Sequence, residues 1–226
     1  MNDPLPYRAM GWLAIINALL IVVPLFIAPI PPLAPGANLV AFNIAHHDML
    51  VLGNYLGVIQ LPVGLILLVF IAAAARAAEA GSRGWLWLLI FGAGMCVTAV
   101  ATVLGFFFFV GPFVVSLGQA ALALLGQVGF YSLDISFANQ ALLLGVIALA
   151  VMRLRFLPAW LGYLAWLMAI LSALATLGVL VSSGPLAATS PAVLFAGGFS
   201  LPVWLLLAGI YWLVHPAART APVAAA

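Results

Sequence analysis

The stretch that decides the fold is residues 9–29, AMGWLAIINALLIVVPLFIAP, which carries no charged side chain. A helix crosses the ~30 Å hydrocarbon core of a bilayer with about 20 apolar residues, so this stretch is long enough for one span. It follows a single arginine, Arg8, and it ends in prolines rather than in the small-residue cleavage site of a signal peptide. We therefore predict that it is the first transmembrane helix.

Five further apolar runs follow, at about 48–75, 85–110, 131–152, 158–181 and 192–214. The chain of 226 residues is 68% hydrophobic and only 4% charged, and its mean hydropathy is +1.35. In a soluble domain about a quarter of the residues are charged, and the interior can bury only part of the chain. We therefore predict an all-α bundle of six transmembrane helices, in one domain over residues 1–226.

The arginines predict the orientation of the bundle. They lie before the first run, between the second and third, between the fourth and fifth, and after the sixth: Arg8, Arg76, Arg83, Arg153, Arg155 and Arg219. The other three connections, at about 30–47, 111–130 and 182–191, contain neither Lys nor Arg. The positive-inside rule makes the arginine side cytoplasmic. Both termini are therefore expected in the cytoplasm, and a bacterial inner membrane is the expected location.

Residues 113–130 leave two alternatives open. The segment is long enough to be a seventh span, but a seventh span would move Arg153 and Arg155 to the outer side. Its polar and small side chains fall at helical spacing on one face: Ser116, Gln119, Ala123, Gln127 and Asp134. We expect either a helix lying in the outer interface of the membrane or an N-terminal extension of the fourth span.

Five residues form the candidate polar site: His46, His47, Asp48, Asn54 and Asp134. The first three enter the second span from the outside, and Asp134 lies near the outer end of the fourth. If they meet at one depth, they can build an acid–base pair or a metal site with His47 and Asp134 as ligands. The simpler interpretation is that Asn43 or Asp48 caps the second helix at the water boundary.

Asp134 supports both interpretations about equally. An ionisable group inside a span is a functional hypothesis by default, because burying it in lipid is costly. Water can reach a group that lies about one turn from the interface, and such a group needs no function. The sequence therefore leaves the role of Asp134 open.

Other function classes lack support in the sequence. Six scattered Arg and no Lys give a net charge of +2, with no basic patch for nucleic acid, so no nucleic-acid partner is expected. Motifs such as HExxH, CxxC, GxSxG or a Gly-rich phosphate loop do not occur. The single cysteine, Cys96, cannot form an internal disulfide. Catalytic residues and any cofactor therefore stay unassigned.

One motif carries a resemblance. Residues 153–163 read RLRFLPAWLGY, a basic turn followed by Leu-Pro-x-Trp-Leu-Gly at the start of the fifth run. With six spans in 226 residues, the chain resembles a family of bacterial six-helix integral membrane proteins classed as a domain of unknown function. The resemblance implies the same layout of spans. That family carries no agreed activity, so the resemblance implies no catalytic residue.

Three functions follow as hypotheses. The preferred one is a non-catalytic accessory or scaffold subunit that packs with other membrane-protein subunits or with lipid, since small-residue faces such as Gly53 and Gly57 allow close helix packing. The second is an outer-leaflet enzyme or metal/cofactor site built on His46, His47, Asp48 and Asp134. The third is a small-solute or proton-coupled transporter, for which Pro62 and Pro202 inside spans are weak hints.

Overall fold

The computed structural model describes residues 5–29, 38–78, 86–87, 90, 92–94, 114–181, 184 and 190–215. Its longer elements are α1 (Leu5–Ile27), α2 (Leu39–Ala78), α4 (Val114–Leu154), α5 (Ala159–Thr176), the 3₁₀ helix η1 (Leu177–Leu180) and α6 (Pro191–Val214). Among the described residues, five helices are long and apolar enough to cross a membrane. The predicted polytopic helix bundle is confirmed. Most of the predicted third span, at about 85–110, lies outside the described residues.

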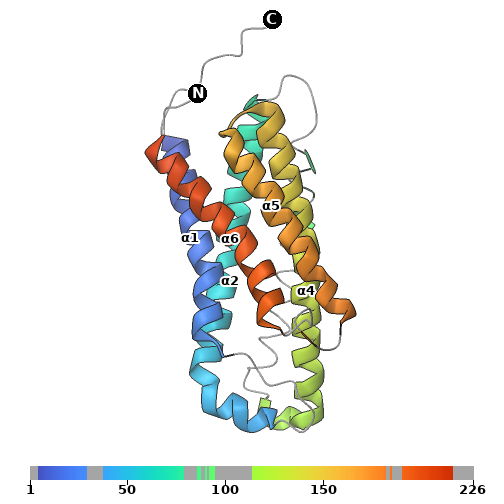
Figure 1. The fold of residues 1–226 in the computed structure, drawn as a ribbon. Coiled ribbons are helices and arrows are strands. Elements are labelled where there is room, and N and C mark those ends of the chain that lie inside the picture. The colour runs from blue at the N-terminus through green and yellow to red at the C-terminus, as the bar shows by residue number, and fades with distance from the viewer. Residues whose placement is uncertain are drawn as a thin grey trace, which may run out of the picture.

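The helices run side by side along one axis (Figure 1). The start of α1 and the end of α6 lie at the same end of the bundle, as does the connection from α4 to α5. Arg76 lies in the last turn of α2 and Arg153 in the last turn of α4, and both helices end there too. This arrangement fits the predicted side for the arginines. We call the opposite end the outer end of the bundle, following the positive-inside rule.

Two glycines bring the backbones of α1 and α6 close together. A Cβ added at Gly209 would lie 2.8 Å from the carbonyl oxygen of Gly11, and one added at Gly11 would lie 2.9 Å from the carbonyl oxygen of Gly209. Both obstacles are backbone atoms, which cannot move aside as a side chain can. Nearer the outer end of the bundle, Trp204 of α6 donates its indole N–H to the carbonyl oxygen of Leu161 in α5 at 3.0 Å. Small residues therefore bring α6 against α1, and a buried hydrogen bond holds it against α5.

Two helices begin earlier than the apolar runs predict. The second run was predicted from about residue 48, but α2 begins at Leu39 and continues through the polar stretch, with non-helical angles at His46 (φ −119°, ψ 15°). Helix α4 contains one break, at Gly118, whose φ of 72° favours glycine. From there it continues to Leu154. Of the two alternatives for residues 113–130, the structure therefore has the N-terminal extension rather than a separate interfacial helix.

Because of these extensions, α2 and α4 project past the other helices at the outer end (Figure 1). A Cβ added at Gly53 would lie 2.9 Å from the Cβ of Ala28, which places Gly53 level with the outer end of α1. Phe137 clusters with Ala175 near the end of α5 and with Val193 in the first turn of α6. The residues before these levels, 39–52 of α2 and 118–132 of α4, are the outer projection.

The two halves of the outer projection pack against each other. The side-chain oxygen of Gln119 accepts a hydrogen bond from the backbone N–H of Leu39 at 3.0 Å. Leu39, Leu50 and Leu122 form a small buried cluster beside it. The polar residue Gln119 thus satisfies a free N–H at the start of α2, and the three leucines close the contact.

The glycine contact between α1 and α6 gives the first prediction. Gly209→Ala should lower the free energy of unfolding by about 1–3 kcal/mol, because the added methyl meets backbone. Gly145→Ala is the matched control, since its Cβ would come no closer than 3.9 Å to the ring of Trp166. The control should keep or slightly raise stability, because alanine is the better helix former. Thermal unfolding in mild detergent measures both; equal stability of the two variants would contradict the contact.

Candidate functional site

The predicted polar residues on α2 all lie in or beside the outer projection. The Nδ1 of His46 lies 2.9 Å from the carbonyl oxygen of Phe42, and the two rings are 4.5 Å apart between centroids. The Nδ1 of His47 lies 3.2 Å from the carboxylate of Asp48, and both side chains are exposed. An ion pair in water contributes little to stability. His46 is thus engaged at the bend of its own helix, while His47 and Asp48 point outward.

The residue that caps the start of α2 lies outside the predicted site. Asn38, just before α2, accepts a hydrogen bond from the backbone N–H of Ala41 at 3.0 Å, as an N-cap residue does. Asn43 instead lies buried and donates its amide to the carbonyl oxygen of Leu39 at 3.0 Å. Its own amide oxygen receives no hydrogen bond from the described part of the chain. Neither Asn43 nor Asp48 therefore caps the start of α2.

Asp134 lies on α4 in a different place from the histidines. Leu122 of α4 packs in one cluster with Leu50 of α2, and Leu50 follows His47 by about one helical turn. Asp134 is twelve residues further along α4, which puts it about 18 Å deeper along the axis. A metal holds its ligands near 2 Å, so His47 and Asp134 are not brought together for one ion. Across the described residues, no group of three or more His, Cys, Asp and Glu side chains is placed to hold a metal.

The carboxyl group of Asp134 is fully buried. Neither of its oxygens receives a hydrogen bond from any residue that the structure describes. Asn54, another residue of the predicted site, lies beside Gly53 at the level of the outer end of α1 and donates to the carbonyl oxygen of Leu50 at 3.1 Å. The predicted site is therefore spread over three environments: exposed projection, helix boundary and bundle interior.

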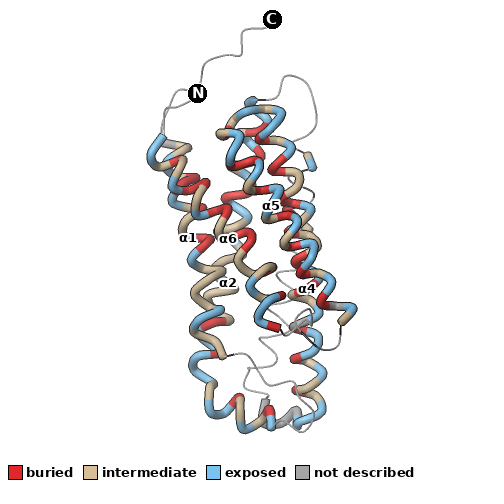
Figure 2. Tube along the Cα trace, in the orientation of Figure 1, coloured by how far each residue is buried: buried red, intermediate tan, exposed pale blue. Residues whose placement is uncertain are grey.

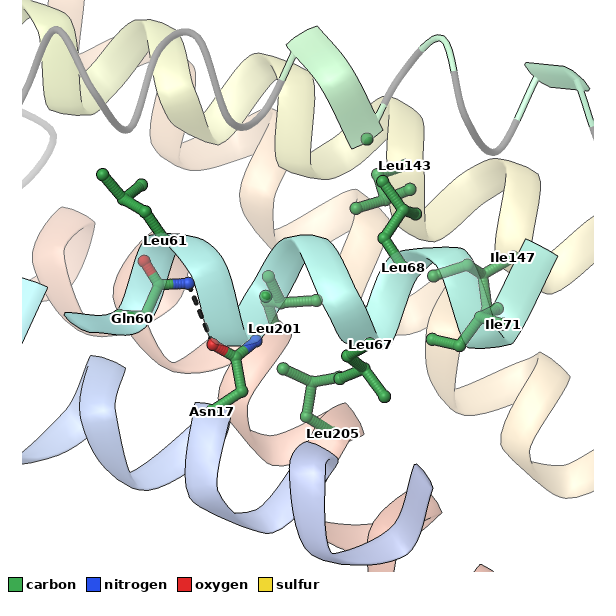
Figure 3. A pocket seen from close by; sticks show the side chains of 12 residues that line it. Asn17, Gln60, Leu61, Leu67, Leu68, Ile71, Leu143, Ile147, Leu201 and Leu205 are labelled. Atoms are coloured by element: carbon green, nitrogen blue, oxygen red, sulfur yellow. Dashed lines mark hydrogen bonds between the residues drawn. The ribbon is translucent and has the colours of Figure 1, made fainter. Parts of the chain in front are cut away.

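The structure assembles a polar pair that the sequence analysis missed. Gln60 of α2 donates its side-chain amide to the side-chain oxygen of Asn17, in the middle of α1, at 3.0 Å (Figure 3). Asn17 is 96% buried, since only 4% of its surface is exposed. The signal was available, because Asn17 is an amide in the middle of an otherwise apolar run. The apolar run around Asn17 gives no sign, however, that Gln60 is its hydrogen-bond partner.

The Asn17–Gln60 pair borders a cavity of about 70 Å³ in the middle of the bundle (Figure 3). Gly64 and Gly92 also contribute to its wall. The other described lining residues are aliphatic and come from α2, α4 and α6: Leu61, Leu67, Leu68, Ile71, Leu143, Ile147, Leu201 and Leu205. The cavity therefore has one polar end and an apolar body.

A second polar contact joins three helices nearer the outer end. The side-chain amide of Gln140 donates to the hydroxyl of Ser172 in α5 at 2.8 Å and to the carbonyl oxygen of Gly197 in α6 at 2.7 Å. All three groups are buried. Both amide hydrogens are thus used for packing, which makes Gln140 a structural residue.

Comparison of the chain with protein-family models, curated proteins and solved structures finds no match. The resemblance carried by residues 153–163 therefore stays a prediction.

Asp134 and Gln140 give opposite predictions for the same measurement. Asp134→Leu should leave the free energy of unfolding unchanged or raise it by about 1–3 kcal/mol, because it removes a buried polar group that lacks a hydrogen-bond partner. Gln140→Leu should lower it by about 1–3 kcal/mol, because it leaves the Ser172 hydroxyl and the Gly197 carbonyl unpaired. Thermal unfolding in mild detergent decides; a loss for Asp134→Leu as large as for Gln140→Leu would show that the carboxyl group is held.

Proposed function

We propose that this multi-pass membrane protein is a non-catalytic accessory or scaffold subunit that binds a partner membrane protein through its outer projection. The observation that carries the proposal is the apolar surface on that projection. In α2 it is formed by Ile44, Met49, Val51 and Leu52, and in α4 by Leu124, Val128 and Tyr131, all exposed. Figure 2 shows how much of both segments is exposed.

The lengths of α2 and α4 support a position of this surface beyond the hydrocarbon core. Helix α2 has 40 residues and the continuous part of α4, from Gly118, has 37. At 1.5 Å per residue, the part of α2 after its bend, residues 47–78, measures about 48 Å and the continuous part of α4 about 55 Å, against ~30 Å for the core. Soluble surfaces rarely expose large apolar patches unless another molecule covers them. A protein surface is therefore the expected cover.

The charge of the projection supports the same partner. Within residues 39–52 and 118–132, the ionisable side chains of Asp, Glu, Lys, Arg and His are His46, His47 and Asp48, all at the bend of α2. The α4 half carries none of these types. Buried interface cores are depleted of charge and rich in large apolar side chains. The α4 half therefore forms the centre of the proposed interface, and His47 and Asp48 lie at its rim.

Localisation follows from the same proposal. Apolar spans and arginines on one side suit the bacterial inner membrane, which would place the projection on the side away from the cytoplasm. The partner must then expose an apolar surface just outside that membrane.

Site-specific photo-crosslinking in cells tests the interface. A photoreactive residue at Leu124 or Val128 should give one discrete heavier product. The same residue at Ile170, which is exposed in the middle of α5, should not give it. Leu124→Asp should weaken formation of that product at position 128 at least tenfold, as expected for an interface centre. Thermal unfolding of the variant confirms that the monomer is intact.

Two outcomes would overturn the proposal. One is crosslinking of equal yield at Leu124, Val128 and Ile170, because such labelling does not depend on the projection. The other is a product made of two differently tagged copies of this chain, because the occupant is then a second copy and not a partner subunit.

A further inference from the structure

The polar end of the central cavity has unused hydrogen-bonding capacity. Gln60 donates to the side-chain oxygen of Asn17, and this bond uses one amide hydrogen of one residue and the oxygen of the other. The amide nitrogen of Asn17 and the side-chain oxygen of Gln60 bond to no other group in the described part of the chain. Exchanging the oxygen and nitrogen of either amide still leaves donors and an acceptor free. The cavity therefore offers a guest molecule both hydrogen-bond donors and an acceptor.

The rest of the cavity sets the size and charge of that guest. A cavity of about 150 Å³ holds one benzene molecule, so a cavity of about 70 Å³ has room for about half as many non-hydrogen atoms, three or four. The described lining residues include no charged side chain, so an ion would be buried there without a counter-charge. Water would satisfy the amides but leave the leucine wall in contact with a polar molecule. A short aliphatic body fills that wall while its polar end reaches the amides.

We propose that the cavity bordered by Asn17 and Gln60 binds a small uncharged molecule of about three or four non-hydrogen atoms, with one hydroxyl or primary amide group and one to three carbons. The polar group accepts from the amide of Asn17 and donates to the side-chain oxygen of Gln60. The aliphatic chain packs toward Leu143, Leu201 and Leu205 (Figure 3).

Gly64 keeps the polar end open. A Cβ added there would lie 3.2 Å from the amide nitrogen of Gln60 and 3.4 Å from the side-chain oxygen of Asn17. Both atoms belong to the polar pair, and the amide nitrogen of Asn17 lies 3.5 Å away, so the methyl of Gly64→Ala would crowd the polar end of the cavity. The substitution retains both amides, which separates loss of space from loss of hydrogen bonding.

Ligand-observed NMR on the full chain in detergent tests the site with ethanol, 1-propanol and acetamide, which have three or four non-hydrogen atoms. At least one should bind saturably, with a Kd of about a millimolar, as expected for so few heavy atoms. Asn17→Leu and Gly64→Ala should each weaken binding at least tenfold, while Gly145→Ala, outside the cavity wall, should not change it. Acetate, which has the size of acetamide but carries a charge, should not bind.

Three results would overturn the site. The first is no saturable binding of any of the three probe molecules to the wild-type chain. The second is unchanged binding to the Gly64→Ala variant, provided that this variant unfolds at the wild-type temperature. The added methyl lies beside Gln60 and should therefore hinder a guest there. The third is binding of acetate as tight as that of acetamide, because the guest class is then not limited to uncharged molecules.

Discussion

Hydrocarbon offers no hydrogen-bond partner to a peptide group, and this constraint governs the whole structure. Each span must be helical, and each polar side chain inside must find its partner within the protein. Gln140 does so by donating to Ser172 and Gly197, and Trp204 by donating to Leu161. These bonds all cross from one helix to another. The few polar groups inside the bundle therefore fix which helices are neighbours, because apolar side chains gain nothing by leaving lipid for each other.

The same constraint gives meaning to the polar groups that remain unpaired. Asp134 is buried near the outer ends of α5 and α6, without a hydrogen bond from any described residue. The Asn17–Gln60 pair is satisfied only in part, and it borders empty space. The two cases differ physically. Asp134 is not among the described residues that line the central cavity, whereas the amide pair borders it and has room for another molecule.

Spans were predictable from the sequence because lipid selects each one locally. The run at 9–29 and the arginines at the connections suffice without any tertiary contact. The candidate site was harder, because its geometry depends on distant residues. Gln119 meets Leu39 across 80 positions, and Gln60 meets Asn17 across 43. Grouping His47 with Asp134 assumed that both lie at one depth. The continuation of α4 past Leu122 puts about 18 Å between their levels along the axis.

The length of α4 also decides what covers the outer projection. A bilayer adapts to an overlong apolar helix by thickening or by tilting it, at fractions of a kcal/mol per Å. Tilting cannot absorb the excess here, because α4 packs along α5 and α6 up to Phe137 and is held in their direction. Thickening by about 20 Å would cost several kcal/mol. Covering Leu124 and Val128 with protein carries no such cost, and it gains the free energy of burying apolar surface. Lipid is therefore the poorer cover for this surface, which supports the proposal of a partner subunit.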